Sequence, residues 1–562
     1  MTLPSLDPVT LEILSNGLRS VTDESFIALM RSSFSTNIKE RRDHSTAIAD
    51  VRGRLVVQAD AALPIHLASM VGLMRSLLGK FRPEDIADGD IFVANDPHVA
   101  GGTHLPDINM AMPVFADGKL IAFVCNIAHH ADVGGSFPGS MAGGMSEIYQ
   151  EGLRIPVVRL FRAGRLQSDI MDLLLLNMRV PDERRGDLNA QVAACRLGRS
   201  RLLELVGRFG RDEVESAFDE VIGRTEARMR AAVARLPDGT WRFEDVMDDD
   251  GLGTVDIRIA LTIEKRGDRI HFDFGGSDPQ VRGNINVTMN ATQSAVCYAM
   301  KALLDPEAPN NQGVIDVMEI EAPLGTIVNC RPPAPVAARA NTCQRIIDIV
   351  IGALAPVLPE AAIGAANGAN TTAVFAGVDP RNGEPYVYLE TLGGGMGGRA
   401  DRDGKDGVQV HITNTSNLPV ESIEMEYPLR VESYGLVEDS GGAGRYRGGM
   451  GLRRRIRPVG GECTFNGAGE RFRNAPWGVF GGAAGGTGRF VLERGDGAGE
   501  LLAIKPSGIR LTPDDAVVVE TPGAGGYGPP AERAAELRRE DAESGKFSTG
   551  YLGRHYGPGE TA

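Results

Sequence analysis

Apolar residues recur at helical spacing near the start of the chain. Asp7-Pro8 is a typical helix start, because Asp caps the first free N–H groups and Pro fits the first turn. The apolar positions that follow recur at helical spacing: Val9, Ile13, Leu14, Leu18 and Val21. This pattern predicts an amphipathic helix that runs to about Arg31. A longer helical block is predicted from about Ser168 to Leu236, where the same spacing returns.

The period of the pattern changes from helical to alternating after Trp241. One strand is predicted at Thr254 to Ile263, and further strands, such as one at Ile423 to Leu429, make the last third of the chain β-rich. Two helices, predicted at residues 291–304 and 342–358, interrupt the strands.

Helical and alternating segments in one chain predict a mixed α+β fold class. At 562 residues the chain is longer than one hydrophobic core normally serves, so several structural units are expected. The predicted units are an N-terminal α/β region, a helical segment, an α+β region, a β-rich region and a C-terminal tail, at residues 1–165, 166–240, 241–420, 421–530 and 531–562.

The stretch from Asn95 to Gly135 concentrates the residues that carry chemistry, with four of the nine histidines and four aspartates. Two apolar runs inside it, at residues 108–115 and 120–127, are separated by Ala116-Asp117-Gly118-Lys119. Asp-Gly between two such runs predicts a β-hairpin, because both residues tolerate the positive φ of a tight turn. The hairpin brings its two far ends together, although about 25 residues separate them in sequence.

These far ends carry His104 and Asp107 on one side, and His129, His130 and Asp132 on the other. Two imidazoles and a carboxylate are ligands for a divalent ion such as Zn²⁺, Mn²⁺ or Fe²⁺, and three protein ligands leave positions open for water or substrate. A two-residue turn puts His130 on the face of Asp107, whereas a longer turn or a bulge puts His129 there. The spacing does not decide whether His129 or His130 is the ligand. The alternative to a metal site is that these are polar residues of a glycine-rich surface loop.

Composition narrows the class of protein. No run of 18 apolar residues occurs, and the N-terminus has neither a basic start nor an apolar segment, so a cytoplasmic protein is expected. The six cysteines contain no CxxC, which predicts reduced thiols. A net charge of −15 argues against nucleic acid or an anionic membrane as a partner. Two GxGxxG matches, at residues 393–398 and 523–528, open no predicted helix, and GxxxxGK[ST] is absent, so no nucleotide loop is recognised.

Several motifs occur together in a fixed order: NDP with GGTHLPDI, then AHHADVGG, EIYQEGLRIP and RGDLNAQVAA, and later HITNTSNLPVESIEMEYPLRV and ETPGAGGYGPP. With these, the chain resembles the hydantoinase B subunit family from Asp7 to about Pro530. That family is related to 5-oxoprolinases and to subunits of acetone and acetophenone carboxylases.

The resemblance implies an ATP-dependent hydrolase that opens a cyclic amide such as hydantoin, 5-oxoproline or a lactam. It also implies a hetero-oligomer in which a hydantoinase A-type partner binds ATP and this chain binds a divalent metal. Two alternatives are a subunit of an ATP-dependent ketone carboxylase and a non-catalytic subunit that positions the ATPase partner.

Carried onto this sequence, the family's metal-binding residues become His104, Asp107 and His129. For the general base, Asp132 is the first choice because it is close in sequence to the ligands, with His130 and Glu151 as the other candidates.

Overall fold

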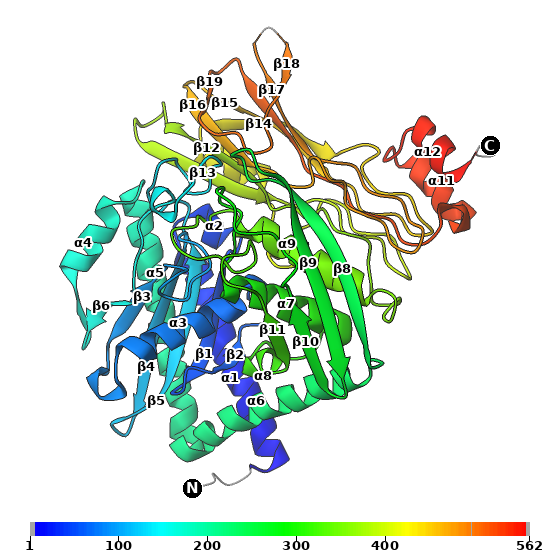
Figure 1. The fold of residues 1–562 in the computed structure, drawn as a ribbon. Helices are drawn as coiled ribbons and strands as arrows, with labels where there is room; N and C mark the ends of the chain where they lie inside the picture. Colours follow the sequence, from blue (N-terminus) through cyan, green and yellow to red (C-terminus); the bar gives the residue numbers. More distant parts are fainter. Residues whose placement is uncertain (1–5, 496, 558–562) are drawn as a thin grey trace.

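The computed structural model describes residues 6–495 and 497–557, and it has the mixed α+β fold predicted from the sequence (Figure 1). The predicted N-terminal helix is α1 (Pro8–Ser32), and the Asp7 carboxylate caps it by accepting hydrogen bonds from the Val9 and Thr10 N–H groups. The predicted helical block contains α4 (Ser168–Leu176), α5 (Pro181–Phe209) and α6 (Arg211–Ala234).

The N-terminal sheet is antiparallel and follows the strand order β2-β1-β5-β4-β3-β6-β7. Its strands are β1 (His44–Asp50), β2 (Leu55–Gln58), β3 (Ile91–Ala94), β4 (Asp107–Ala116), β5 (Lys119–His129), β6 (Val158–Arg162) and β7 (Arg165–Leu166). Every residue of β1 is buried, because α1, α5 and α6 cover one face and α3 (Leu67–Lys80) covers the other (Figure 1). Ile48 packs on the first of these faces, whereas Ala47 and Ala49 pack on the second.

The middle of the chain forms a sheet in the order β11-β10-β9-β8. Its strands are β8 (Gly239–Asp249), β9 (Val255–Arg266), β10 (Arg269–Asp273) and β11 (Met318–Glu321). Two buried helices, α7 (Met289–Leu304) and α9 (Arg339–Leu354), lie between this sheet and α3, so that one apolar core joins them. Every residue of α9 is buried.

The C-terminal part forms two further sheets with one core between them, in the orders β13-β12-β16-β19 and β14-β15-β20-β17-β18. The strands are β12 (Thr371–Val378), β13 (Pro385–Leu392), β14 (Leu429–Leu436), β15 (Leu452–Pro458), β16 (Cys463–Ala468), β17 (Arg489–Glu493), β18 (Gly499–Leu501), β19 (Ile509–Leu511) and β20 (Ala516–Glu520). Two short helices, α11 (Ala535–Glu543) and α12 (Thr549–Tyr556), project at one side (Figure 1).

The strand predicted at Ile423 to Leu429 is wrong over most of its length. Residues Val420–Glu426 form helix α10, and β14 begins only at Leu429. Pro419 occupies the N-cap and fixes an extended entry to the first turn, and Ile423 is the buried position of the helix.

The two glycine-rich GxGxxG matches lie where backbone segments pack directly on each other. A Cβ atom on Gly395 would overlap the carbonyl oxygen of Gly449, and one on Gly525 would overlap that of Trp477. These glycines are therefore explained by close backbone packing, in agreement with the missing helix after each motif.

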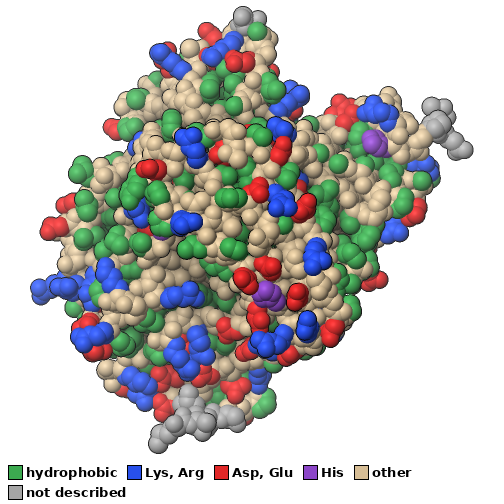
Figure 2. All heavy atoms as spheres, in the orientation of Figure 1, with side chains coloured by type: hydrophobic (Ala, Val, Ile, Leu, Met, Phe, Trp, Pro, Cys, Tyr) green, Lys and Arg blue, Asp and Glu red, His purple; other side chains and the backbone are tan. Residues whose placement is uncertain are grey.

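Within residues 6–495 and 497–557, no helix has the length and apolar character needed to cross a membrane. All six cysteines lie in this part of the chain and are buried free thiols, as predicted. On the face shown in Figure 2, acidic and basic side chains are interspersed over most of the surface.

Candidate metal centre

The hairpin of β4 and β5 has the predicted two-residue turn. Asp117 and Gly118 both have positive φ, of 50° and 73°. Beyond the turn the register shifts by one residue, because Phe115 pairs with Leu120 but Val114 pairs with Ala122. Ile121 is thus the extra residue of a β-bulge on β5.

This bulge decides between the two candidate rings. Asp107, the first residue of β4, pairs with His129, the last residue of β5. Paired residues share a face of the sheet, so His129 and not His130 lies beside Asp107. His130 lies on the opposite face, where its Nε2 donates a hydrogen bond of 3.0 Å to Gln191 Oε1 of α5.

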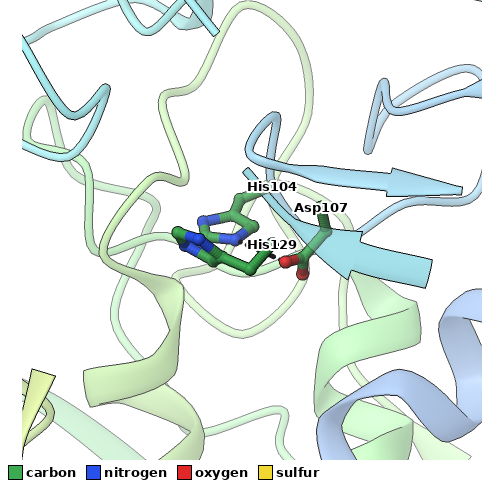
Figure 3. Close-up of side chains that lie close together, drawn as sticks. All are labelled: His104, Asp107 and His129. Atoms are coloured by element: carbon green, nitrogen blue, oxygen red, sulfur yellow. Dashed lines mark ion pairs between the residues drawn. The ribbon is translucent and has the colours of Figure 1, made fainter. Parts of the chain in front are cut away.

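His104, Asp107 and His129 form one buried cluster (Figure 3). One nitrogen of each ring and one carboxylate oxygen all lie within 4.8 Å of one another. The His104 and His129 ring centroids are 5.0 Å apart, and His104 Nε2 lies 3.0 Å from Asp107 Oδ1. His104 and Asp107 are fully buried, and His129 is 5% exposed.

The hydrogen bonds around the cluster fix which atoms face one another. His104 Nδ1 lies 3.0 Å from the Ala337 carbonyl oxygen, which only accepts, so Nδ1 carries the proton and Nε2 carries a lone pair. Asp107 Oδ2 accepts from Arg339 Nη2 at 2.7 Å and from the Thr103 hydroxyl at 3.1 Å. His104 Nε2 and Asp107 Oδ1 have no hydrogen-bond partner among the described residues.

Two lone-pair atoms held 3.0 Å apart in a buried site repel each other unless a cation lies between them. The residues present therefore fit a divalent ion with two imidazole ligands and one carboxylate ligand. The neighbours fit as well, because metal-binding histidines usually have their second ring nitrogen held by a hydrogen bond. His104 is held in this way by the Ala337 carbonyl.

The electrostatic environment favours the protonation states that bind metal. Burial lowers the pKa of His104 and His129, so both rings are neutral near pH 7. Burial alone would raise the pKa of Asp107, but the Arg339 guanidinium beside it favours the carboxylate, and this pKa lies well below its usual range. Asp107 is therefore ionised, and the cluster offers two neutral rings and one carboxylate.

Two residues that support the cluster were not predicted from the sequence. Arg339 is the first residue of α9, and its Nε donates to the Thr103 hydroxyl at 3.1 Å while Nη2 donates to Asp107. His66 ends the single turn η1 (Pro64–His66), and its Nε2 lies 3.7 Å from Asp107 Oδ2. Both lie far from the hairpin in sequence, and neither stands in a motif with metal-ligand spacing.

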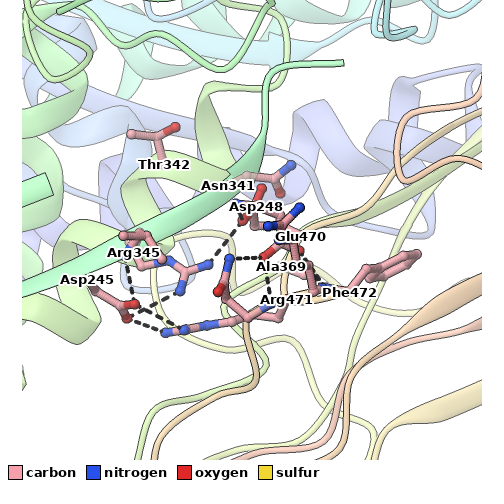
Figure 4. A network of polar contacts seen from close by, with 12 residues as sticks. Asp245, Asp248, Asn341, Thr342, Arg345, Ala369, Glu470, Arg471 and Phe472 are labelled. Atoms are coloured by element: carbon pink, nitrogen blue, oxygen red, sulfur yellow. Dashed lines mark hydrogen bonds and ion pairs between the residues drawn. The ribbon is translucent and has the colours of Figure 1, made fainter. Parts of the chain in front are cut away.

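A buried charge network anchors the helix that carries Arg339 (Figure 4). Arg345, one and a half turns further along α9, is fully buried and lies 3.2 Å from Asp245 of β8 and 3.1 Å from Glu470. Arg471 contacts Asp245 at 2.7 Å and Asp348 of α9 at 3.0 Å. The network thus joins α9 to β8 and to the loop that follows β16.

The residues predicted as general bases lie outside the cluster and have other hydrogen-bond partners. Asp132 accepts hydrogen bonds from the Gly134 and Gly139 N–H groups and from Arg179. Glu151 Oε1 accepts from the N–H groups of residues 336 and 337, the segment whose Ala337 carbonyl holds His104, and burial raises the pKa of Glu151 to about 8. The catalytic roles of Asp132, His130 and Glu151 stay predictions.

A small cavity of about 20 Å³ borders His129, with room for roughly one water molecule. Its walls come from the N-terminal region, from α9 and from the C-terminal part of the chain: Asp43, Leu63, Ile65, His129, Met141, Arg339, Asn370, Thr391 and Thr413. We call it the metal pocket. Arg41 lies behind its wall, fully buried, and donates to the Thr391 hydroxyl, while its Nε and Nη1 have no partner among the described residues.

Residues 7–530, nearly the whole chain, match the sequence family described as hydantoinase B/oxoprolinase. This chain belongs to the hydantoinase B/oxoprolinase family. A member of known name, the caprolactamase subunit beta of Pseudomonas jessenii, is 33% identical over 98% of this chain and 96% of its own length.

Solved structures agree with this family assignment. The crystal structure of the ATP-dependent caprolactamase from Pseudomonas jessenii has a TM-score of 0.93, with 30% identity over 99% of this chain and 96% of that chain. A nucleotide-free acetone carboxylase structure has a TM-score of 0.90 at 19% identity, over 98% of this chain and 79% of that chain. The second likeness concerns the fold alone.

Proposed function

We propose that this hydantoinase B/oxoprolinase family member is the metal-binding subunit of an ATP-dependent enzyme that opens a cyclic amide, such as hydantoin, 5-oxoproline or a lactam. The family and the similarity to caprolactamase subunit beta support the cyclic-amide class. The observation that carries the metal-binding part is the buried pair of unpartnered atoms, His104 Nε2 and Asp107 Oδ1, held 3.0 Å apart.

In this proposal His104, Asp107 and His129 hold a Zn²⁺, Mn²⁺ or Fe²⁺ ion. When bound, such an ion polarises a carbonyl oxygen and lowers the pKa of water. Arg339 and Thr103 engage Asp107 Oδ2, so that Oδ1 is the oxygen left for the ion. The Ala337 carbonyl keeps the proton of His104 on Nδ1 and therefore keeps Nε2 available as a ligand atom.

For the proton acceptor we propose Asp43. Its side chain lines the metal pocket, whereas the carboxylate of Asp132 already accepts hydrogen bonds from three residues. The backbone of Asp43 also accepts from the His129 N–H at 3.0 Å, which fixes it beside a proposed ligand. A water molecule in the metal pocket would thus have a carboxylate next to it to take its proton.

The ATP-dependent step belongs to a second subunit in this proposal. The sequence has no GxxxxGK[ST] loop, and the glycines of both GxGxxG matches are used in backbone packing. The similar chain from Pseudomonas jessenii is itself named a subunit beta. We therefore propose a hetero-oligomer with a hydantoinase A-type ATPase.

The test begins with elemental analysis of the purified wild-type chain and of His104→Ala. We expect about one divalent ion per wild-type chain and a loss of at least tenfold in the variant. His98→Ala is the matched control, because His98 lies in the same stretch and bonds to the Ala334 carbonyl outside the cluster. Each protein is then combined with the A-type subunit, ATP and a panel of hydantoin, 5-oxoproline and caprolactam, and ring-opened product and ADP are measured.

A wild-type chain without a stoichiometric ion, or a His104→Ala chain that retains it, would contradict the metal assignment. ATP consumption that depends on bicarbonate and a ketone, with no ring opening in the panel, would favour the carboxylase alternative over cyclic-amide hydrolysis.

A further inference from the structure

A larger cavity lies on the other side of η1 from the metal pocket. Leu63 and Ile65 line the metal pocket, whereas Pro64 and Leu67 line this second cavity, so a single helical turn separates the two. The second cavity has a volume of about 240 Å³ and lies between η1 and α7. Helices α3 and α7, which border it, lie side by side in the molecule (Figure 1). We call it the α7 cavity.

The walls of the α7 cavity combine an apolar surface with one cation. Leu67, Tyr298 and Val314 contribute apolar area, and Lys301 lies at the border to a neighbouring cavity of about 260 Å³ that it also lines. The Lys301 Nζ donates a hydrogen bond of 2.8 Å to Asn310 Oδ1, and among the described residues it has no other acceptor. An ammonium group has three N–H donors, so two remain for a ligand.

The neighbouring cavity also offers unpaired hydrogen-bonding capacity. Gln58 lines it and is only 3% exposed, yet neither its amide oxygen nor its amide nitrogen has a partner among the described residues. A buried amide with both groups unpaired costs free energy unless a ligand or water satisfies it. The two cavities share Lys301 in their walls, and between them they offer an apolar wall, the Lys301 ammonium group and an amide that both donates and accepts.

One loop borders both the α7 cavity and the metal pocket. Thr413 lines the metal pocket, and His411 Nδ1 lies 3.5 Å from the hydroxyl of Tyr298 in the α7 cavity. Between them, the Ile412 carbonyl accepts a 3.2 Å hydrogen bond from the Ile65 N–H of η1. His411 has a φ of 52°, in the left-handed region that is unfavourable for a residue with a side chain. The two cavities are thus separated by η1 and by this loop, which the hydrogen bond between Ile65 and Ile412 joins.

The chemistry of ring opening indicates what fits the α7 cavity. When water adds to the carbonyl carbon of a cyclic amide and the C–N bond breaks, one chain results, with a carboxylate at one end and the nitrogen at the other. The metal pocket has room for about one water molecule, so this longer and charged product needs a place outside it. A carboxylate on an apolar chain matches Lys301 beside Leu67, Tyr298 and Val314.

We propose that the α7 cavity binds the ring-opened product, with its carboxylate on Lys301 and its apolar chain along Leu67 and Tyr298. This inference rests on the proposed function, because it takes the product class from cyclic-amide hydrolysis. It assigns a binding role to Lys301, a residue outside the metal centre.

The test is calorimetric titration of the full-length chain with 6-aminohexanoate, the ring-opened form of caprolactam, and with its neutral amide. We expect the carboxylate to bind at least tenfold more tightly than the amide. Lys301→Met, which keeps the apolar stem of the side chain, should weaken the carboxylate at least tenfold, and Lys301→Arg should restore part of the affinity. Lys80→Met is the control, since Lys80 donates to the Val157 carbonyl and lines neither cavity.

Repeating the titration after removal of metal with a chelator separates this inference from the proposed function. Binding that survives chelation and is lost in Lys301→Met supports the α7 cavity. Binding that is lost on chelation and kept in Lys301→Met would place the carboxylate at the metal centre and overturn the inference while leaving the proposed function intact. If the wild-type chain binds the carboxylate and the amide with equal affinity, or binds neither, the inference about the α7 cavity is also overturned.

Discussion

Replacing Asp107 with Asn is the sharpest test of the metal centre, because the change keeps the shape of the side chain. The amide oxygen of Asn can still accept from Arg339 and Thr103, as Asp107 Oδ2 does. The amide nitrogen then takes the place of Oδ1, 3.0 Å from His104 Nε2, and offers a hydrogen to that lone pair. The variant therefore replaces a ligand oxygen with a donor group that repels a cation.

The structure gives the expected magnitudes. Loss of the charge on the partner of buried Arg339 costs about 1.5–3 kcal/mol, and a new hydrogen bond to His104 returns about 1 kcal/mol. Without metal, the variant should lose roughly 0.5–2 kcal/mol of unfolding free energy. With an ion at 100 times its Kd the wild type gains about 2.7 kcal/mol, and the variant should gain none of it. The gap between the two proteins should thus widen to roughly 4 kcal/mol when metal is added.

The assay is denaturant unfolding followed by circular dichroism, with and without added Zn²⁺ or Mn²⁺, together with elemental analysis. Asp132→Asn is the matched control, because Asp132 is also a buried carboxylate bound to an arginine, at 3.0 Å from Arg179. It should lose stability but keep the ion and the metal-dependent gain. An Asp107→Asn chain that binds the ion with wild-type affinity would refute the reasoning, and so would an equal loss of metal in the control.

Further predictions concern the supporting residues. In metal-free protein, the raised pKa of about 8 for Glu151 makes stability fall as pH rises from the unfolded value of 4.5 through 8, because the folded chain keeps the proton longer. Glu151→Gln should remove that fall, as measured by unfolding at pH 5 and pH 8, and an unchanged pH profile would contradict it. Arg339→Lys should weaken metal binding about 10- to 100-fold in a chelator competition, because lysine lacks the planar guanidinium that bonds to both Thr103 and Asp107. Unchanged metal affinity would contradict a role for Arg339 in positioning Asp107. Gly118→Ala should cost about 1–2 kcal/mol of unfolding free energy through its left-handed backbone alone, with metal content unchanged, because a Cβ there meets nothing within 4 Å.

The local parts of the site could be predicted from the sequence. Asp117-Gly118 between two apolar runs is a short-range hairpin signal, and the turn has the positive φ values that this dipeptide tolerates. The dense His and Asp content at both ends then predicted the cluster. The pattern could not decide between His129 and His130, because the two residues are adjacent. The bulge at Ile121 decides between them, and no sequence motif predicts that bulge.

The parts that depend on long-range packing were missed. Arg339 reaches Asp107 because it is the first residue of α9, which is buried between α7 and strands β8 and β9. His66 reaches Asp107 because η1 precedes the buried helix α3. No spacing rule connects residues 232 positions apart. The strand predicted at Ile423 to Leu429 failed for a local reason. Pro419 stands at the N-cap of α10, and its carbonyl accepts a hydrogen bond from the Ile423 N–H, which closes the first helical turn.

The buried bulge at Ile121, close to the hairpin turn, decides which histidine reaches the metal centre at the other end of the two strands. Nine residues lie between Asp107 and Asp117, roughly 30 Å of extended strand. Side chains alternate along a strand, so the parity of the residue count decides which histidine meets the carboxylate. Surface turns normally tolerate gain or loss of a residue, but here one extra residue sets the register. If β5 ran without the bulge at the same chain length, Asp107 would face Ala128, so that His130 would share its face and His129 would point toward α5. We therefore expect the bulge at Ile121 to matter to the metal centre as much as the identity of the ligands themselves.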